Sequence, residues 1–175
     1  MNDHLNYILD SISQFQNEAK IRGNHKTYTD DYVLESKALI FSKAMKCARE
    51  GNLLEMIRQL DYYRLIYSKD FDINERQVSG NGRTLLQEAS MYGNIKCVEW
   101  ILTRDTVDVN KVSLVGKETA LHYACSNDHL PVVLTLLQNG ANPNKRNKWN
   151  LTAFDYCQSE PILTLLSSFR GGRND

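Results

Sequence analysis

The sequence has no long apolar stretch and no sign of a secretion signal. Its longest apolar runs, such as VVLTLL at residues 132–137, fall far short of the roughly 20 residues that span a bilayer. The first 25 residues contain no basic start followed by an apolar block, as a signal peptide would. We therefore expect a soluble protein of the cytoplasm or nucleus that makes no membrane contact.

An excess of charge of either sign is also missing, since Lys and Arg together number 21, and Asp and Glu together number 21. Such a balance gives no overall attraction to nucleic acid or anionic lipid, so neither is an expected partner. The four cysteines lie 28 to 50 residues apart and include no C-x-x-C pair. This spacing fits neither a disulfide-rich secreted scaffold nor a zinc ribbon, so reduced thiols are expected.

Fingerprints of the common enzyme classes are missing as well. The chain has no G-x-x-x-x-G-K-[ST], G-x-G-x-x-G, H-E-x-x-H or G-x-S-x-G pattern. The sequence therefore contains no motif for a phosphate-binding loop, a dinucleotide-binding site or the commoner hydrolytic active sites. We expect no enzymatic activity, no cofactor and no bound metal.

What the sequence does contain is an internal repeat. Its 175 residues, 42% of them apolar, suffice for one substantial packed domain. The stretch 82–110 aligns with 117–144, and a third copy opens at residue 150. Threonines at positions 84, 119 and 152 are 35 and 33 residues apart, and asparagines at positions 74, 110 and 144 are 36 and 34 apart. Two independent landmarks thus give the same period.

These copies resemble the ankyrin repeat, which opens G-x-T-P-L-H-x-A-A, continues V-V-x-L-L-L and closes G-A-x-x-N. The nearest match runs TALHYAC at 119–125, VV at 132–133 and GANPN at 140–144. The resemblance implies an all-α fold, an ankyrin-repeat solenoid of about four stacked helix-turn-helix units with hairpin fingers and an N-terminal helical cap. The array is expected over 36–175, with a degenerate repeat, two full repeats and a shortened C-terminal cap at about 36–78, 79–111, 113–145 and 146–169.

The first of these repeats departs most from the pattern. In the segment KAMKCAREGN at 43–52, three residues fall in register with the second repeat: Cys47 with Ala89, Ala48 with Ser90 and Gly51 with Gly93. This repeat lacks the threonine and has a longer second helix, which leaves its boundary open.

The apolar period independently predicts two short antiparallel helices in each repeat. In the second copy, apolar residues recur at helical spacing over 85–89 and over 98–102, with Gly93-Asn94 between the two runs. Pro131 and Pro161 fit the first turn of a second helix, where the missing N–H costs nothing. Small residues on the first helices allow close approach of neighbouring repeats, so the stack buries a continuous core.

His122 and Cys125 admit both a catalytic and a structural interpretation. They lie three residues apart and share a helix face, as a nucleophile and its base could. The resemblance instead implies that the opening Thr and His hydrogen-bond locally and to the next repeat, with Cys125 at a packing position. Repeats stack about 8–10 Å apart, so four cysteines in four repeats cannot all come within about 2.3 Å of one zinc ion. We favour a structural histidine and core thiols.

The resemblance also implies that the array binds another protein through a concave face of hairpin tips and first helices. Residues at the variable positions of this face are the expected partner contacts: Asn81, Arg83, Met91, Tyr92, Val115, Glu118, Ser126, Asn127, Lys148, Trp149 and Leu151. Aromatic, Met and Arg side chains are enriched at interface centres. Alternatively, a tyrosine before the turn glycine is an ordinary feature of such repeats, and Trp149 covers the end of the stack.

Two further features bear on partners. The basic run KRNK at 145–148 either favours an acidic partner or is simply solvated. Residues 1–35 lie outside the repeats, and apolar residues at helical spacing over 5–15 predict an amphipathic helix, followed by a polar link at 22–31. This helix either caps the first repeat or docks on a partner. We expect a monomer.

Three functions fit these observations. The first is an adaptor, scaffold or inhibitor without activity of its own. The second is a bacterial effector delivered into the host cytoplasm, because the Asn-rich and Tyr-rich composition suits an AT-rich genome. The third is a recognition domain of a larger enzyme.

Overall fold

The computed structural model describes residues 30–67, 72–77 and 80–170, with side chains described from residue 37 onward. Eight helices lie in these ranges: α2 Asp30–Glu50, α3 Leu53–Ile66, α4 Leu85–Met91, α5 Ile95–Leu102, α6 Ala120–Ser126, α7 Leu130–Gln138, α8 Ala153–Tyr156 and α9 Glu160–Arg170. None of the described residues forms a strand. The predicted helix at 5–15 and most of the polar link after it lie outside the described residues.

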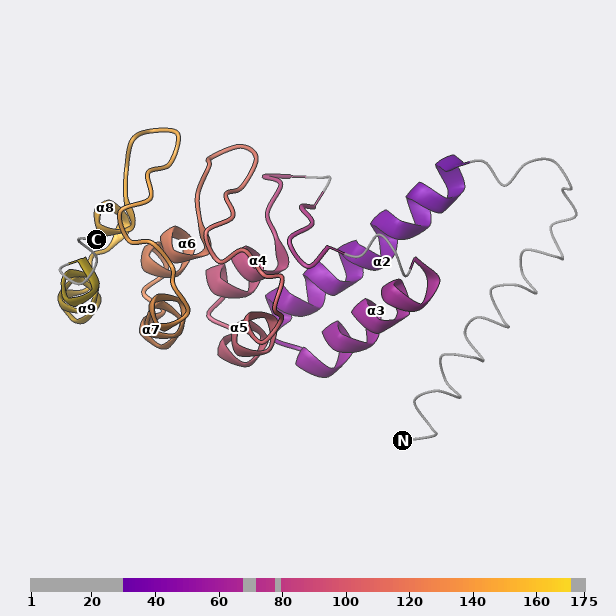
Figure 1. Ribbon diagram of the computed structural model, residues 1–175, viewed down its shortest axis with the longest axis horizontal. Helices are drawn as coiled ribbons and strands as arrows, with labels where there is room; N and C mark the ends of the chain where they lie inside the picture. Colours follow the sequence, from indigo (N-terminus) through magenta and orange to yellow (C-terminus); the bar gives the residue numbers. More distant parts are fainter. Residues whose placement is uncertain (1–29, 68–71, 78–79, 171–175) are drawn as a thin grey trace, which may run out of the picture. The chain divides into compact units, whose positions relative to one another are not determined.

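Residues 38–175 belong to one unit, in which the helices follow one another as pairs (Figure 1). The first helix of each later pair contacts the next first helix, α4 with α6 and α6 with α8, and the second helices α5, α7 and α9 contact one another in the same order. The loops between pairs project on one side of this row (Figure 1). The all-α solenoid of stacked helix pairs is thereby confirmed.

The core runs through the stack rather than sitting within any one pair. Alanines on the first helices, Ala89, Ala124 and Ala153, are fully buried, as are branched residues on the second helices, Val98, Ile101, Val133, Ile162 and Leu166. Helices of seven or eight residues are too short to be stable alone in water. Burial of each large aliphatic side chain contributes about 1.5–3 kcal/mol, so contact between neighbouring pairs supplies most of the stability.

A threonine caps each of the later first helices. The side chain of Thr84 accepts a hydrogen bond from the backbone of Gln87, whose side chain accepts one in return from the Thr84 N–H. The same reciprocal box joins Thr119 to His122 and Thr152 to Asp155. The residues at the repeat period therefore satisfy the N–H groups that a helix start leaves open.

The turn inside each of the first three pairs contains a residue with positive φ, which is Gly51, Gly93 or Asp128. In the second and third pairs the residue after it reaches back to the preceding repeat. Asn94 Nδ2 donates to the carbonyls that end α2, and His129 Nε2 lies 3.1 Å from the carbonyl oxygen of Met91 at the end of α4. A Cβ added at Gly93 would lie 2.7 Å from the His129 ring, so the repeats are in close contact at this turn.

The structure tests the predictions about the prolines and the cysteines. Pro131 and Pro161 are each the second residue of a second helix, α7 and α9, as expected. Cys47, Cys97 and Cys125 are buried, which confirms three of the core thiols. Cys157 is only partly buried, at the end of the four-residue helix α8, but it packs against the same core.

None of the described helices combines the length and apolar character needed to cross a bilayer.

Candidate functional site

Each loop that precedes a first helix turns back on itself as a finger. One backbone hydrogen bond of 2.9 Å closes each finger at the residue before the capping threonine, and the closed segments are 77–83, 113–118 and 147–151. The fingers thus become shorter from the first to the third. Because every finger ends at a helix cap, the helices determine where the fingers stand.

Neighbouring fingers are joined by backbone hydrogen bonds in a constant register. The N–H of Val115 donates to the carbonyl of Asn81 at 3.4 Å, and the N–H of Lys148 donates to the carbonyl of Gly116 at 3.0 Å. In both bonds the donor lies four residues before the capping threonine of its own repeat. The acceptor lies three residues before the capping threonine of the preceding repeat. The fingers therefore form one continuous ridge, called the finger ridge below.

The finger ridge exposes large apolar side chains. Leu114 and Val115 on the second finger are at least half exposed, and so is Trp149 on the third finger at 54%, with Leu151 beside it. Lys148 Nζ lies 4.4 Å from the centroid of the Trp149 ring, which is cation–π geometry. We call these four apolar residues the finger-tip patch.

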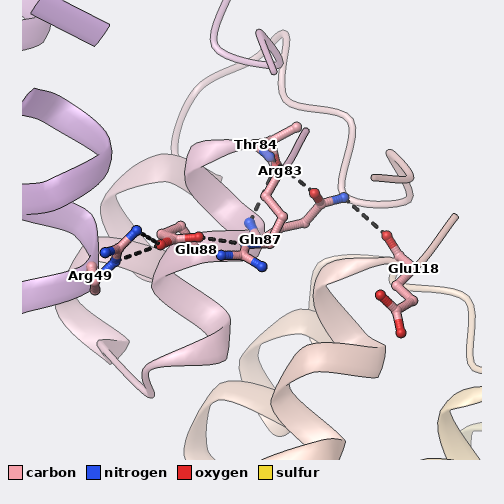
Figure 2. A network of polar contacts seen from close by, with 6 residues as sticks. All are labelled: Arg49, Arg83, Thr84, Gln87, Glu88 and Glu118. Carbon is pink, nitrogen blue, oxygen red and sulfur yellow. Dashed lines mark hydrogen bonds and ion pairs between the residues drawn. The ribbon is translucent and has the colours of Figure 1, made fainter. Parts of the chain in front are cut away.

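A buried carboxylate joins two repeats beside this ridge. Glu88 on α4 is fully buried, and one of its oxygens lies 2.7 Å from both Nε and Nη2 of Arg49 on α2. Its other oxygen accepts a hydrogen bond of 2.6 Å from Nε of Arg83, at the end of the first finger (Figure 2). Burying a lone carboxylate costs several kcal/mol, and the two guanidinium groups offset that cost through charge-assisted hydrogen bonds.

Each of these arginines also lies over a tyrosine ring. The guanidinium carbon of Arg49 is 5.6 Å from the centroid of Tyr92, and that of Arg83 is 5.7 Å from the centroid of Tyr123. Glu88 therefore fixes two arginine–aromatic pairs on neighbouring repeats. We call these five residues the arginine strip.

A second polar group lies between the second and third fingers. The Tyr156 hydroxyl donates to Glu118 at 2.9 Å and accepts a hydrogen bond of 2.7 Å from Asn147. Burial, together with the hydrogen bond to Glu118, raises the pKa of Tyr156 to about 12. This tyrosine therefore stays protonated and acts as a structural donor.

His122 is part of the link between repeats and is not free for chemistry. Its Nδ1 lies 3.2 Å from the Thr119 nitrogen and 2.8 Å from the Thr119 hydroxyl, and its Nε2 lies 3.2 Å from the carbonyl oxygen of Leu151. Burial lowers its pKa and raises that of the Cys125 thiol to about 12, so neither thiolate nor imidazolium is favoured. The structural interpretation of His122 is confirmed.

Gln87 makes the same link one repeat earlier. Its side-chain nitrogen donates to the carbonyl of Lys111. The same nitrogen donates to the carbonyl of Glu118 (Figure 2). Glu118 and Leu151 both immediately precede a capping threonine, so Gln87 and His122 are equivalent. The chain uses either side chain for this bond between repeats.

The structure places the predicted partner contacts in two groups. The finger group comprises Asn81, Arg83, Val115, Glu118, Lys148, Trp149 and Leu151, and the group at the ends of α4 and α6 comprises Met91, Tyr92, Ser126 and Asn127. Most of them are exposed, with Tyr92 at 44%, whereas Met91, Arg83 and Glu118 are partly buried. Arg83 and Glu118 are held by bonds within the chain, which the sequence does not predict.

The sequence-based prediction missed Arg49 and Tyr123. Arg49 has a usable signal, because the alignment of Cys47 with Ala89 puts it in register with Met91. Tyr123 occupies the variable position of the T-P-L-H-x-A motif, and Glu88 occupies it one repeat earlier. No motif indicates that this glutamate is buried.

Comparisons with known proteins agree with the fold. The family described as ankyrin repeats (3 copies) matches residues 44–147. An ankyrin and IPT/TIG repeat-containing protein of Schizosaccharomyces pombe is 29% identical over 167 residues, which are 91% of this chain and 14% of that protein. An E3 ubiquitin-protein ligase of Caenorhabditis elegans is 36% identical over 59% of this chain and 4% of its own length.

A putative ankyrin repeat protein of fowlpox virus is 34% identical over 66% of this chain and 35% of that protein. The chain thus spans about a third or less of the length of these relatives. The family match covers more than half of the chain and coincides with the stacked helix pairs and their fingers. The chain belongs to the ankyrin repeat family.

Proposed function

We propose that this chain is a non-catalytic adaptor, scaffold or inhibitor that binds a protein partner through the finger ridge and the arginine strip. Ankyrin repeats generally mediate protein–protein interaction. The observation that carries the proposal is the finger-tip patch, a cluster of exposed apolar side chains held on fingers that are hydrogen-bonded to one another.

The residue types of this surface favour binding. Trp149 and Tyr92 are large side chains with few rotatable bonds, and such residues, together with arginine, dominate the energetics of protein interfaces. The hydrogen bonds between fingers and the two bonds of Glu88 hold the surface in place before a partner arrives. Less ordering entropy is then lost on binding, which raises affinity.

Partner capture followed by substitution tests the proposal. The immobilised 175-residue chain captures proteins from a lysate of the source cells, and mass spectrometry identifies them. The Tyr92→Ala, Trp149→Ala double variant should lose the partner while keeping its melting curve. Leu54→Ala is the matched control, because Leu54 is an exposed apolar residue at 79% on the second helix α3. Retention of the partner by the double variant, or its loss in the control, contradicts the proposed face.

A second candidate is a recognition domain within a larger protein. It is favoured by the relatives, of which this chain spans between 4% and 35%, one of them an E3 ubiquitin-protein ligase. In that arrangement the same face selects a substrate for activity located elsewhere in the protein. The full-length reading frame decides between the two candidates, because only the second requires a further catalytic domain.

A further inference from the structure

Basic charge is concentrated on the third finger and the loop leading to it. Residues 139–151 contain Lys145, Arg146 and Lys148 and no acidic residue, whereas the corresponding loop 103–118 contains three basic and three acidic residues. All three basic side chains are exposed. The loop and finger over residues 139–151 thus carry a local excess of positive charge next to the finger-tip patch, which loop 103–118 does not.

The acidic groups facing this finger already have partners. Glu118 accepts a hydrogen bond from the Tyr156 hydroxyl, and Asp155 accepts hydrogen bonds from the backbone and hydroxyl of Thr152. The Thr152 bonds, followed by the charge of Arg146, lower the pKa of Asp155. Arg146 in turn donates to the carbonyl of Asn150, which fixes the finger.

Two lysines are therefore left to attract a ligand. Lys145 is exposed, and Lys148 lies against the Trp149 ring, so a cation and an apolar ring form one surface. The second finger is hydrogen-bonded to the third through Lys148 and Gly116. Val115 on the second finger is therefore the next exposed apolar residue along the finger ridge. Adjacent repeats lie about 8–10 Å apart, a distance that three residues of extended chain span at about 3.3 Å each.

We propose that the third finger and the finger-tip patch bind an extended acidic segment of the partner protein. An apolar or aromatic side chain of that segment contacts Trp149 and Val115, and its neighbouring carboxylates pair with Lys145 and Lys148. This inference rests on the proposed function and specifies the chemistry of the partner. Nucleic acid is less well matched, since the chain as a whole carries no excess of positive charge.

Selection from a displayed library of random dodecapeptides on the full-length chain tests the inference without knowledge of the partner. Enriched peptides are synthesised, and their affinities are measured for wild type, Trp149→Ala and the double variant Lys145→Glu, Lys148→Glu. The charge control is Arg64→Glu with Lys96→Glu, because both residues are exposed and lie on the second helices α3 and α5. Every variant is first shown to melt as wild type does.

The expected result is enrichment of peptides that carry Asp or Glu on either side of an apolar residue. Their affinity should fall at least fivefold for Trp149→Ala and for the charge-reversed finger, and by less than twofold for the control. Raising the salt concentration should weaken wild-type binding, since exposed charge pairs are screened. A peptide with Lys in place of its acidic residues should regain affinity for the charge-reversed finger.

Three outcomes overturn the inference. Enriched peptides without acidic residues, or with less than a fivefold response to the charge reversal, exclude the acidic segment. A failure to enrich any peptide excludes binding of an extended segment. Equal or tighter binding of a single-stranded RNA 20-mer assigns the finger to nucleic acid. The first two outcomes leave the proposed function standing, because capture of a folded partner from lysate tests it separately.

Discussion

The buried Glu88 gives the most demanding prediction about stability. Replacing it with glutamine keeps the size of the side chain but removes the charge and turns one hydrogen-bond acceptor into a donor. At least one bond to a guanidinium group is then lost, and a charged bond of this kind contributes about 1.5–3 kcal/mol. The positive charge of Arg83, whose side chain is 15% exposed, then no longer faces a negative charge on residue 88.

The expected loss in free energy of unfolding is smaller than the loss from breaking a fully buried ion pair. Removing one partner of such a pair costs about 3–5 kcal/mol. Here the side chain of Arg49 is 44% exposed and regains water when it loses its partner. We therefore expect Glu88→Gln to lower the free energy of unfolding by about 2–3 kcal/mol and the melting temperature by roughly 5–10 °C.

Two companion variants make the test specific. Arg49→Gln should cost less than about 1 kcal/mol, because Arg49 is partly solvated and Glu88 keeps its bond to Arg83. Arg83→Gln should cost more than Arg49→Gln. Unfolding is followed in urea by circular dichroism, since guanidinium salt would screen the charges. A change of under 0.5 kcal/mol in Glu88→Gln, or the reverse order of the two arginines, would refute the role assigned to this carboxylate.

Three further predictions concern the repeat framework. The variant Thr119→Val with His122→Ala should melt at a lower temperature with near wild-type helical circular dichroism in the native state, and an unchanged melting temperature contradicts the structural role of His122. Burial lowers the pKa of His122 below its usual 6.5, so as pH falls below about 6.5 the unfolded chain takes up a proton that the folded chain does not, and stability should decrease. Replacing His122 with Gln, the residue that makes the equivalent bond at position 87, should reduce this loss of stability between pH 7 and pH 5.5, as measured by urea denaturation. An unchanged pH dependence would disprove that His122 causes the loss. Asp128→Gly should raise the free energy of unfolding by about 0.5 kcal/mol, because Asp128 has a φ of 56° where Gly93 has 71°; a loss of stability in urea denaturation would count against strain at that turn.

Much of the fold could be predicted because each landmark has a local physical cause. A threonine three residues before Gln87 or His122 predicts a helix start, since it caps the helix with a reciprocal bond. Pro131 indicates the first turn of α7 for an equally local reason. These signals lie within a few residues of one another and recur with the repeat period, so one sequence suffices to place them.

The arginine strip could not be predicted in the same way. Arg49 and Glu88 are 39 residues apart, and nothing in their immediate surroundings marks the glutamate as buried. A charged residue at this position is ordinarily solvated, and the guanidinium group of Arg49 reaches it only because α2 and α4 lie in neighbouring repeats. Cys157 packs against the core but is less buried than the equivalent Ala89, because it lies just past the end of α8, which the sequence does not predict.

Isothermal titration of the captured partner tests the central claim of a protein-binding finger face most directly. Wild type, the Tyr92→Ala, Trp149→Ala double variant and Leu54→Ala are compared after matching melting curves. Each lost interface anchor costs about 2 kcal/mol or more, so the double variant should bind on the order of a thousandfold more weakly while Leu54→Ala binds as wild type does. Binding by the double variant within twofold of wild type would contradict the claim.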